Sequence, residues 1–234
     1  MLTQLEIYNH ACSAVGTRGS ITSLAEASRE RTLCDTFYPT VRKQVLCAHH
    51  WAAGLRGSRL TQIVERDFAV DWDVDDHPLP PWAYSYEYPD DMLHPRYLTN
   101  YENFTLATQA MGNDPRVPAI LTNRGGDTVA EKPILIYTAD EDDTTLWSTG
   151  LASAVYMGLA AHICKPLTGS TRKQQGLLEE ANRHIMIARI ADANSEMVPQ
   201  EHMPDWLVAR GISGPTNPNR FIYPVGSLFT GVSE

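Results

Sequence analysis

The chain has 234 residues, 43% of them apolar, enough for the buried core of one large domain or two small ones, which excludes a disordered chain. Its 28 acidic and 19 basic residues give a formal charge of −9, which argues against a surface that grips nucleic-acid phosphates or anionic lipids. No apolar run approaches the roughly 20 residues of a membrane span, and the first residues lack the features of a secretory signal. We therefore expect a soluble protein made in a cytosol.

Two helices are predicted within the first fifty residues. Thr3 and Glu6 have the spacing of a capping box, and apolar residues then recur every three or four positions until Gly16 ends the helix. A second helix start at Ser23 is followed by a long amphipathic run. Pro39 falls inside this run and removes one backbone hydrogen bond, so we expect a kink there. The two helices are expected to form an antiparallel hairpin.

The pattern changes between Trp51 and about Asp140, where proline and glycine become frequent and helical periodicity disappears. Alternating residues at 84–88 and 104–108 and an apolar run at 133–137 are typical of strands. The sequence therefore predicts a small β insert between two helical halves.

An acidic loop is predicted within this insert. Residues 65–91 carry nine acidic side chains against one basic side chain, Arg66. Four of the acids stand close together: Asp71, Asp73, Asp75 and Asp76. They begin like a calcium loop, but Asp76 stands where the tight turn requires glycine, and Trp82 stands where a bidentate glutamate belongs. We interpret the run as a solvated loop that holds no metal.

Two more helices are predicted after the insert. Acidic residues at 141–143 favour a helix start, and an apolar row with a spacing of four residues follows. A second row consists of small residues four positions apart: Gly150, Ala154 and Gly158. Such a row lets another backbone come close, so this helix should be the most buried one. Pro166 and Gly169 end it, and a fourth helix from Ser170 to about Met197 completes a second hairpin. The residues of this helix that are expected to face inward are Leu178, Ala181, Ile185 and Ala188.

The segment after Pro199 alternates proline and glycine, yet it carries few charges and many large apolar residues. The candidate partner-binding residues are Trp206, Leu207, Phe221, Ile222, Tyr223, Leu228 and Phe229. An extended arm that packs on another chain is one interpretation, and an arm that wraps over its own domain is the other.

These elements predict an α+β fold that is mainly α: an antiparallel helical bundle of two helix hairpins, with a small β insert and an extended C-terminal arm. The helical core would comprise residues 1–52 and 141–198, the β-rich insert residues 53–140, and the arm residues 199–234.

No catalytic pattern is complete in the sequence. It has no G-x-S-x-G elbow, no phosphate-binding glycine loop and no H-E-x-x-H motif. The four cysteines form no C-x-x-C pair and are interpreted as buried thiols, while His10 and His184 are interpreted as packing or surface residues. A pair of carboxylates at glycosidase spacing stays open, but the abundance of acids selects no pair. We expect no catalytic residue, no metal and no cofactor.

Several segments then form a recognisable series. They include CDTFYPTVR at 34–42, WAYSYEYPDDML at 82–93, ILTN at 120–123, and LASAVYMGLAAHICKPLTGS at 151–170. In order and spacing they resemble the head-to-tail adaptor family of short-tailed phages, often called tail tubular protein A. The resemblance spans roughly residues 3–198. The segment after Pro199 and the loop at 67–81 depart from the family pattern.

The resemblance implies a ring of twelve copies in the virion tail, assembled in the host cytoplasm. The ring would dock beneath the portal protein and hold the tail nozzle (tubular protein B), with tail fibres as a further contact. Phage DNA would pass through the lumen, and a negative wall would not retain it. The resemblance would place the acidic loop at the nozzle or the lumen, and the arm on a neighbouring subunit or the portal.

Two alternatives belong to other classes of protein. One is a tail-associated peptidoglycan hydrolase, suggested only by the supply of acids and histidines. The other is a tail-completion or terminator ring farther down the tail.

Overall fold

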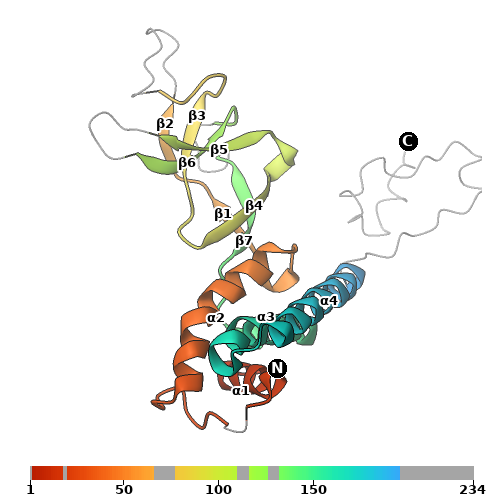
Figure 1. The fold of residues 1–234 in the computed structure, drawn as a ribbon. Helices are drawn as coiled ribbons and strands as arrows, with labels where there is room; N and C mark the ends of the chain where they lie inside the picture. The colour runs from red at the N-terminus through yellow and green to blue at the C-terminus, as the bar shows by residue number, and fades with distance from the viewer. Residues whose placement is uncertain (1, 18–19, 66–76, 110–115, 126–131, 196–234) are drawn as a thin grey trace, which may run out of the picture. The chain divides into compact units, whose positions relative to one another are not determined.

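The computed structural model describes residues 2–17, 20–65, 77–109, 116–125 and 132–195 (Figure 1). Four α-helices lie in these ranges: α1 (Gln4–Val15), α2 (Arg29–Cys47), α3 (Thr149–Thr168) and α4 (Thr171–Ser195). The strands are β1 (Leu55–Arg59), β2 (Gln62–Glu65), β3 (Tyr84–Glu87), β4 (Met92–Leu98), β5 (Phe104–Gln109), β6 (Val117–Thr122) and β7 (Ile134–Ala139).

The expected fold class, a mainly helical bundle with a small β insert, is wrong. About half of the described residues are helical and 23% lie in strands, so the protein has a mixed α/β fold. The seven strands form two antiparallel sheets, in the orders β1-β7-β4 and β2-β3-β6-β5. Buried residues of both sheets, among them Tyr86, Leu98 and Leu135, form a second hydrophobic core. This region is therefore a folded unit with its own interior and not a small insert.

The helix ends follow the local sequence with two shifts. Thr3 and Glu6 form the capping box at the start of α1, and Gly16 ends that helix in the left-handed conformation, with φ at 77°. The second helix begins after Ser28 rather than at Ser23, and it continues through Pro39 to Cys47. The third begins after Ser148, because Asp143 instead caps a short 3-10 turn by accepting a hydrogen bond from Thr145 N at 2.9 Å.

The predicted hairpin of the first two helices is also wrong, because α3 is the common partner of α1, α2 and α4. Ten of its twenty residues are buried, more than in any other described helix. The contact of α1 with α2 is narrow. It includes the Tyr8 and Tyr38 rings, with centroids 5.4 Å apart, and a 2.9 Å hydrogen bond from Tyr8 Oη to Asp35 Oδ1. The second hairpin, α3 with α4, is present as expected.

The row of small residues on α3 serves two neighbours. A Cβ atom added to Gly158 would lie 2.9 Å from Val41 Cγ1 of α2, closer than carbon atoms pack. One added to Gly150 would lie 3.0 Å from Ala188 Cβ of α4. The small side chains therefore let α2 and α4 approach α3 at different points along its length, as the sequence pattern indicated.

Ion pairs join the ends of helices and strands within residues 42–141. Arg42 of α2 reaches Asp140, just after β7, at 2.8 Å. Arg56 of β1 bridges Asp91 and Glu141, each at 2.7 Å. The Glu141 side chain is only 6% exposed, so its charge depends on Arg56 for compensation.

The cysteines provide a simple check of the packing. Cys12, Cys34 and Cys164 are buried and Cys47 is exposed, and all four are free thiols. A hydrogen bond with Cys12, together with burial, raises the pKa of the Cys34 thiol well above its usual range. We expect a thiol reagent to modify only Cys47 rapidly in the native protein and all four cysteines after denaturation. Rapid native labelling of Cys34, read by peptide mass spectrometry, would contradict this packing.

Candidate functional site

The two sets of site residues predicted from the sequence lie outside the described residues. The acidic residues Asp71, Asp73, Asp75 and Asp76 fall in 66–76, and the partner-binding residues Trp206, Leu207, Phe221, Ile222, Tyr223, Leu228 and Phe229 fall in 196–234. Both sets stay predictions. The described residues offer two other surfaces.

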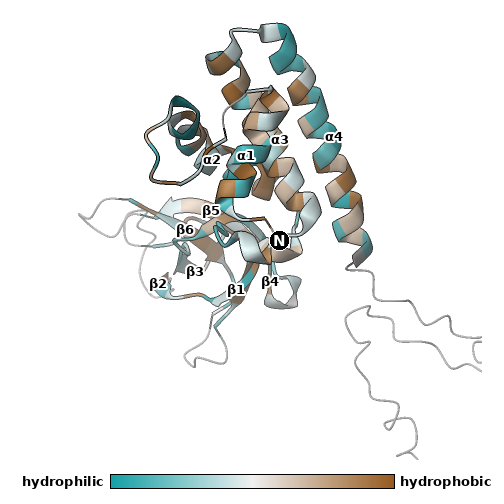
Figure 2. Cartoon of the chain, turned by 90° about the horizontal axis from the view of Figure 1, so that it is seen from below, coloured by the Kyte–Doolittle hydropathy of each residue, from teal (hydrophilic) through white to brown (hydrophobic). Residues whose placement is uncertain are grey.

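The first surface is an exposed apolar stripe on the second half of α4. It consists of Met186, Ile187 and Ile190, which are 63%, 60% and 63% exposed. We call this stripe the α4 face. Brown, apolar segments along α4 are visible in Figure 2. The opposite side of the helix, with Ala181 and Ala188, is buried, so these three side chains are directed away from the helical core.

Contacts on the buried side hold α4 in place. His184 Nδ1 lies 3.3 Å from Ser153 Oγ of α3, so this histidine packs between helices, one of the two roles expected for it. Near the end of α4 the buried Asp192 accepts a hydrogen bond from Ala52 N at 3.2 Å, and its Oδ2 lies 3.6 Å from His49 Nε2. The α4 face is thus presented by a helix that is anchored along its length.

The sequence contains a signal for the α4 face, but the periodicity of the apolar residues did not distinguish this exposed face from the buried face of the helix. Leu178 was expected to face inward, but it is 41% exposed, and its neighbour Leu177 packs against the core instead. Apolar residues at 185–187 and 190 cover more of the helix circumference than one buried stripe needs. This excess is typical of a helix that contacts partners on two sides.

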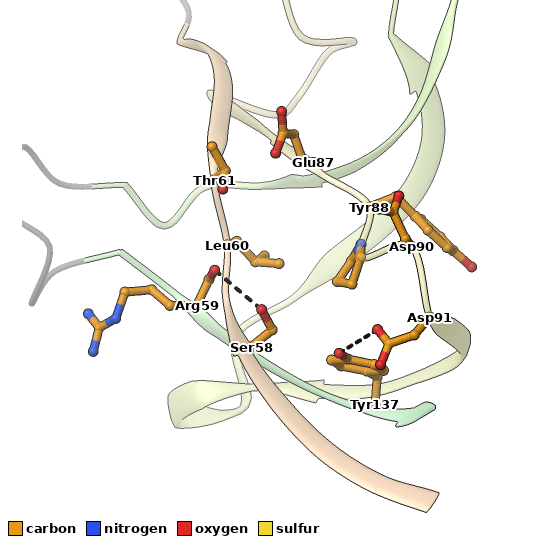
Figure 3. A pocket seen from close by; sticks show the side chains of 10 residues that line it. Ser58, Arg59, Leu60, Thr61, Glu87, Tyr88, Asp90, Asp91 and Tyr137 are labelled. Carbon is orange, nitrogen blue, oxygen red and sulfur yellow. Dashed lines mark hydrogen bonds between the residues drawn. The ribbon is translucent and has the colours of Figure 1, made fainter. Parts of the chain in front are cut away.

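The second surface is a groove of about 370 Å³ between the sheets, shown in Figure 3. It is lined by residues of two segments and one strand: Ser58, Arg59, Leu60, Thr61, Glu87, Tyr88, Pro89, Asp90, Asp91 and Tyr137. A neighbouring hollow shares Glu87, Tyr88 and Asp90 with it. The charged residues that line the two hollows are three acids, Glu87, Asp90 and Asp91, and one base, Arg59.

Three polar side chains of this groove, those of Ser58, Asp91 and Tyr137, already make hydrogen bonds within the protein. Tyr137 Oη donates to Asp91 Oδ1 at 2.8 Å (Figure 3). Arg56 binds the other oxygen of the same carboxylate at 2.7 Å. Burial, with the Asp91 hydrogen bond, raises the pKa of Tyr137 to about 12, so the phenol stays protonated at neutral pH. Ser58 Oγ donates to a backbone carbonyl, and no histidine or cysteine lines the groove. We assign the groove no catalytic role.

Two other kinds of site are absent from the described residues. No cluster of three or more histidine, cysteine, aspartate or glutamate side chains there could hold a metal ion. None of the helices in the described ranges is long and apolar enough to cross a membrane.

No protein-family model matches the chain, and no curated protein matches it either.

Proposed function

We propose that the protein is a structural head-to-tail adaptor of a short-tailed phage, which forms a ring between the portal and the tail nozzle. The observation that carries the proposal is the α4 face. Its three large apolar side chains are exposed to water on an anchored helix. When a second chain covers them they leave water, and this burial is favourable. Such a surface suits a protein whose task is assembly.

A ring accounts for this surface and for the overall charge together. In a cyclic assembly each subunit uses one patch to contact a different patch of the next subunit, and the contact repeats until the ring closes. The α4 face would form one side of that contact. A chain with a net charge of −9 would line the lumen with few groups that bind phosphate, so the genome could pass. The resemblance adds the copy number of twelve and the portal, nozzle and tail fibres as partners.

The proposal is tested by measuring the oligomeric state with and without the portal. Native mass spectrometry and electron microscopy of the purified protein should detect a closed ring, either alone or on addition of portal rings. A protein that stays monomeric and does not bind portal rings under all tested conditions would contradict the adaptor function.

The segment after Pro199 gives a second test of the same function. A chain that ends at residue 199 keeps every described helix and strand, because α4 ends at Ser195. We therefore expect a folded chain with a cooperative thermal transition, together with impaired ring formation or portal binding. Normal assembly by the shortened chain would show that the arm is dispensable.

A further inference from the structure

The four edge strands of the two sheets differ in how well they are protected from pairing with another chain. Natural proteins protect an edge with charges, proline, bulges or a short strand. The edge strand β1 carries Arg56 and Arg59, and β4 contains Pro95 and two irregularities in its register. The edge strand β2 has only four residues, ends in Glu65 and also has an irregular register. Among the edge strands in the described part of the chain, only β5 has none of these features.

The residues of β5 form a regular and uncharged edge. All six, FTLATQ, pair with β6 without a shift in register. None is charged and none is proline. Leu106, near the middle of the strand, is 45% exposed although leucine gains free energy on burial. An edge of this kind is the usual template for addition of a further strand.

The hydrogen bonds identify which groups of β5 face outward. Glu87 N donates to Thr61 O at 2.8 Å, so the backbone of Glu87 faces β2, and Ala119 opposite it faces β5. Ala107 is therefore bonded to β6. Because the direction alternates along a strand, the N–H and C=O groups of Phe104, Leu106 and Thr108 point to the open edge.

Two further observations agree with this assignment. Pro118, which lies opposite Thr108, has no N–H group, so this pair suits a position without hydrogen bonds to β6. Within the described ranges, no hydrogen bond reaches the outward backbone groups of Phe104, Leu106 or Thr108.

We propose that β5 pairs in antiparallel orientation with β5 of a second copy, with Leu106 beside Leu106 of that copy. The strand is complementary to itself in this register. Phe104 comes to lie opposite Thr108, and every outward N–H group finds an outward C=O group. The exposed leucine is then covered by its own counterpart, and the two four-stranded sheets become one continuous sheet.

This contact is distinct from the ring of the proposed function. A two-fold contact uses the same patch on both subunits, whereas a single ring uses two different patches. The inference therefore concerns the free protein and does not depend on the adaptor function. One strand edge is smaller than the standard interface of about 1,600 Å², so we expect a reversible dimer that depends on concentration.

The test compares two lysine substitutions in the full chain. L106K places like charges next to each other at the centre of the contact, and we expect the dissociation constant of the dimer to rise about tenfold or more in sedimentation equilibrium. L55K is the matched control, because Leu55 is equally exposed, at 46%, and lies on the edge strand β1. It should leave the dimer unchanged.

Amide hydrogen exchange gives a second readout that does not depend on a variant. Protection at Phe104, Leu106 and Thr108 should increase with protein concentration, while Ala107 should be protected at all concentrations. A protein that is monomeric at all concentrations, or a dimer that L106K leaves intact, would overturn the inference. So would outward amides protected equally at every concentration, because that result would mean that the edge is covered by the same chain. If the L106K variant still forms rings with portal, the adaptor function is not contradicted, whatever the result for the dimer.

Discussion

Replacement of Gly158 by leucine is expected to lower the melting temperature by roughly 2–12 °C, corresponding to about 1–3 kcal/mol. The reason is the close contact of α3 with α2, where even a Cβ atom would lie 2.9 Å from Val41 Cγ1. Val41 is buried and β-branched, so its side chain has little freedom to move aside. The leucine would therefore push α2 away from α3. Thermal unfolding followed by circular dichroism measures the effect.

Gly176 provides a matched control in the same kind of element. It lies inside α4, and a Cβ atom added there would meet nothing within 4 Å. G176L should therefore keep or slightly raise the melting temperature, since leucine forms helices better than glycine does by up to about 1 kcal/mol. Equal melting temperatures for G158L and the wild type would contradict the close packing of α2 on α3.

The double substitution I187K/I190K is expected to abolish ring formation and to leave the fold intact. Both side chains are at least 60% exposed, and substitutions at such positions usually change stability by less than about 0.5 kcal/mol. In a ring, however, each copy would bury two lysines without partners, and the cost repeats at every contact. Native mass spectrometry with portal rings measures assembly, and the melting temperature reports on folding.

Leu178 supplies the control for this pair. It is on the same helix and 41% exposed, but it lies in the first half of α4 and outside the α4 face. L178K should assemble like the wild type. If I187K/I190K assembles normally too, the α4 face is not part of the ring contact, and the main support for the proposed function is lost.

The helices were largely predictable from the sequence because their signals are local. The capping box at Thr3, the left-handed Gly16 and the small-residue row of α3 each depend on residues within one or two turns. The errors arose where tertiary contacts determine which helices pack together. The hairpin of α1 and α2 was expected from their order in the chain, but α3, which follows about one hundred residues later, offers both of them a larger apolar surface.

The strands were predictable only where they alternate or are continuously apolar. Strands β3, β5 and β7 lie at the three runs that were identified. Strands β1 and β2 have no apolar alternation, and β4 and β6 contain Pro95 and Pro118, which argue against a strand. These four strands are specified by pairing with neighbours that are distant in sequence, and this information is absent from any local pattern.

The two surfaces that carry the proposals were not predicted, for different reasons. The α4 face differs from a core stripe only in what covers it, and burial is a property of the folded chain. The open edge of β5 became recognisable only after the order of strands was known, because the same six residues in a central strand would be fully paired.

The arrangement of the helices has a consequence for synthesis. Apolar residues of α1 and α2 are buried against α3, yet about one hundred residues separate Cys47 from Thr149. At the ribosome this distance corresponds to about 5–20 s of translation. During that time Val41 and Val45 have no packing partner on α3, so the nascent N-terminal segment is a natural client for a chaperone. The contacts of α1 and α2 with α3 can form only after α3 has emerged.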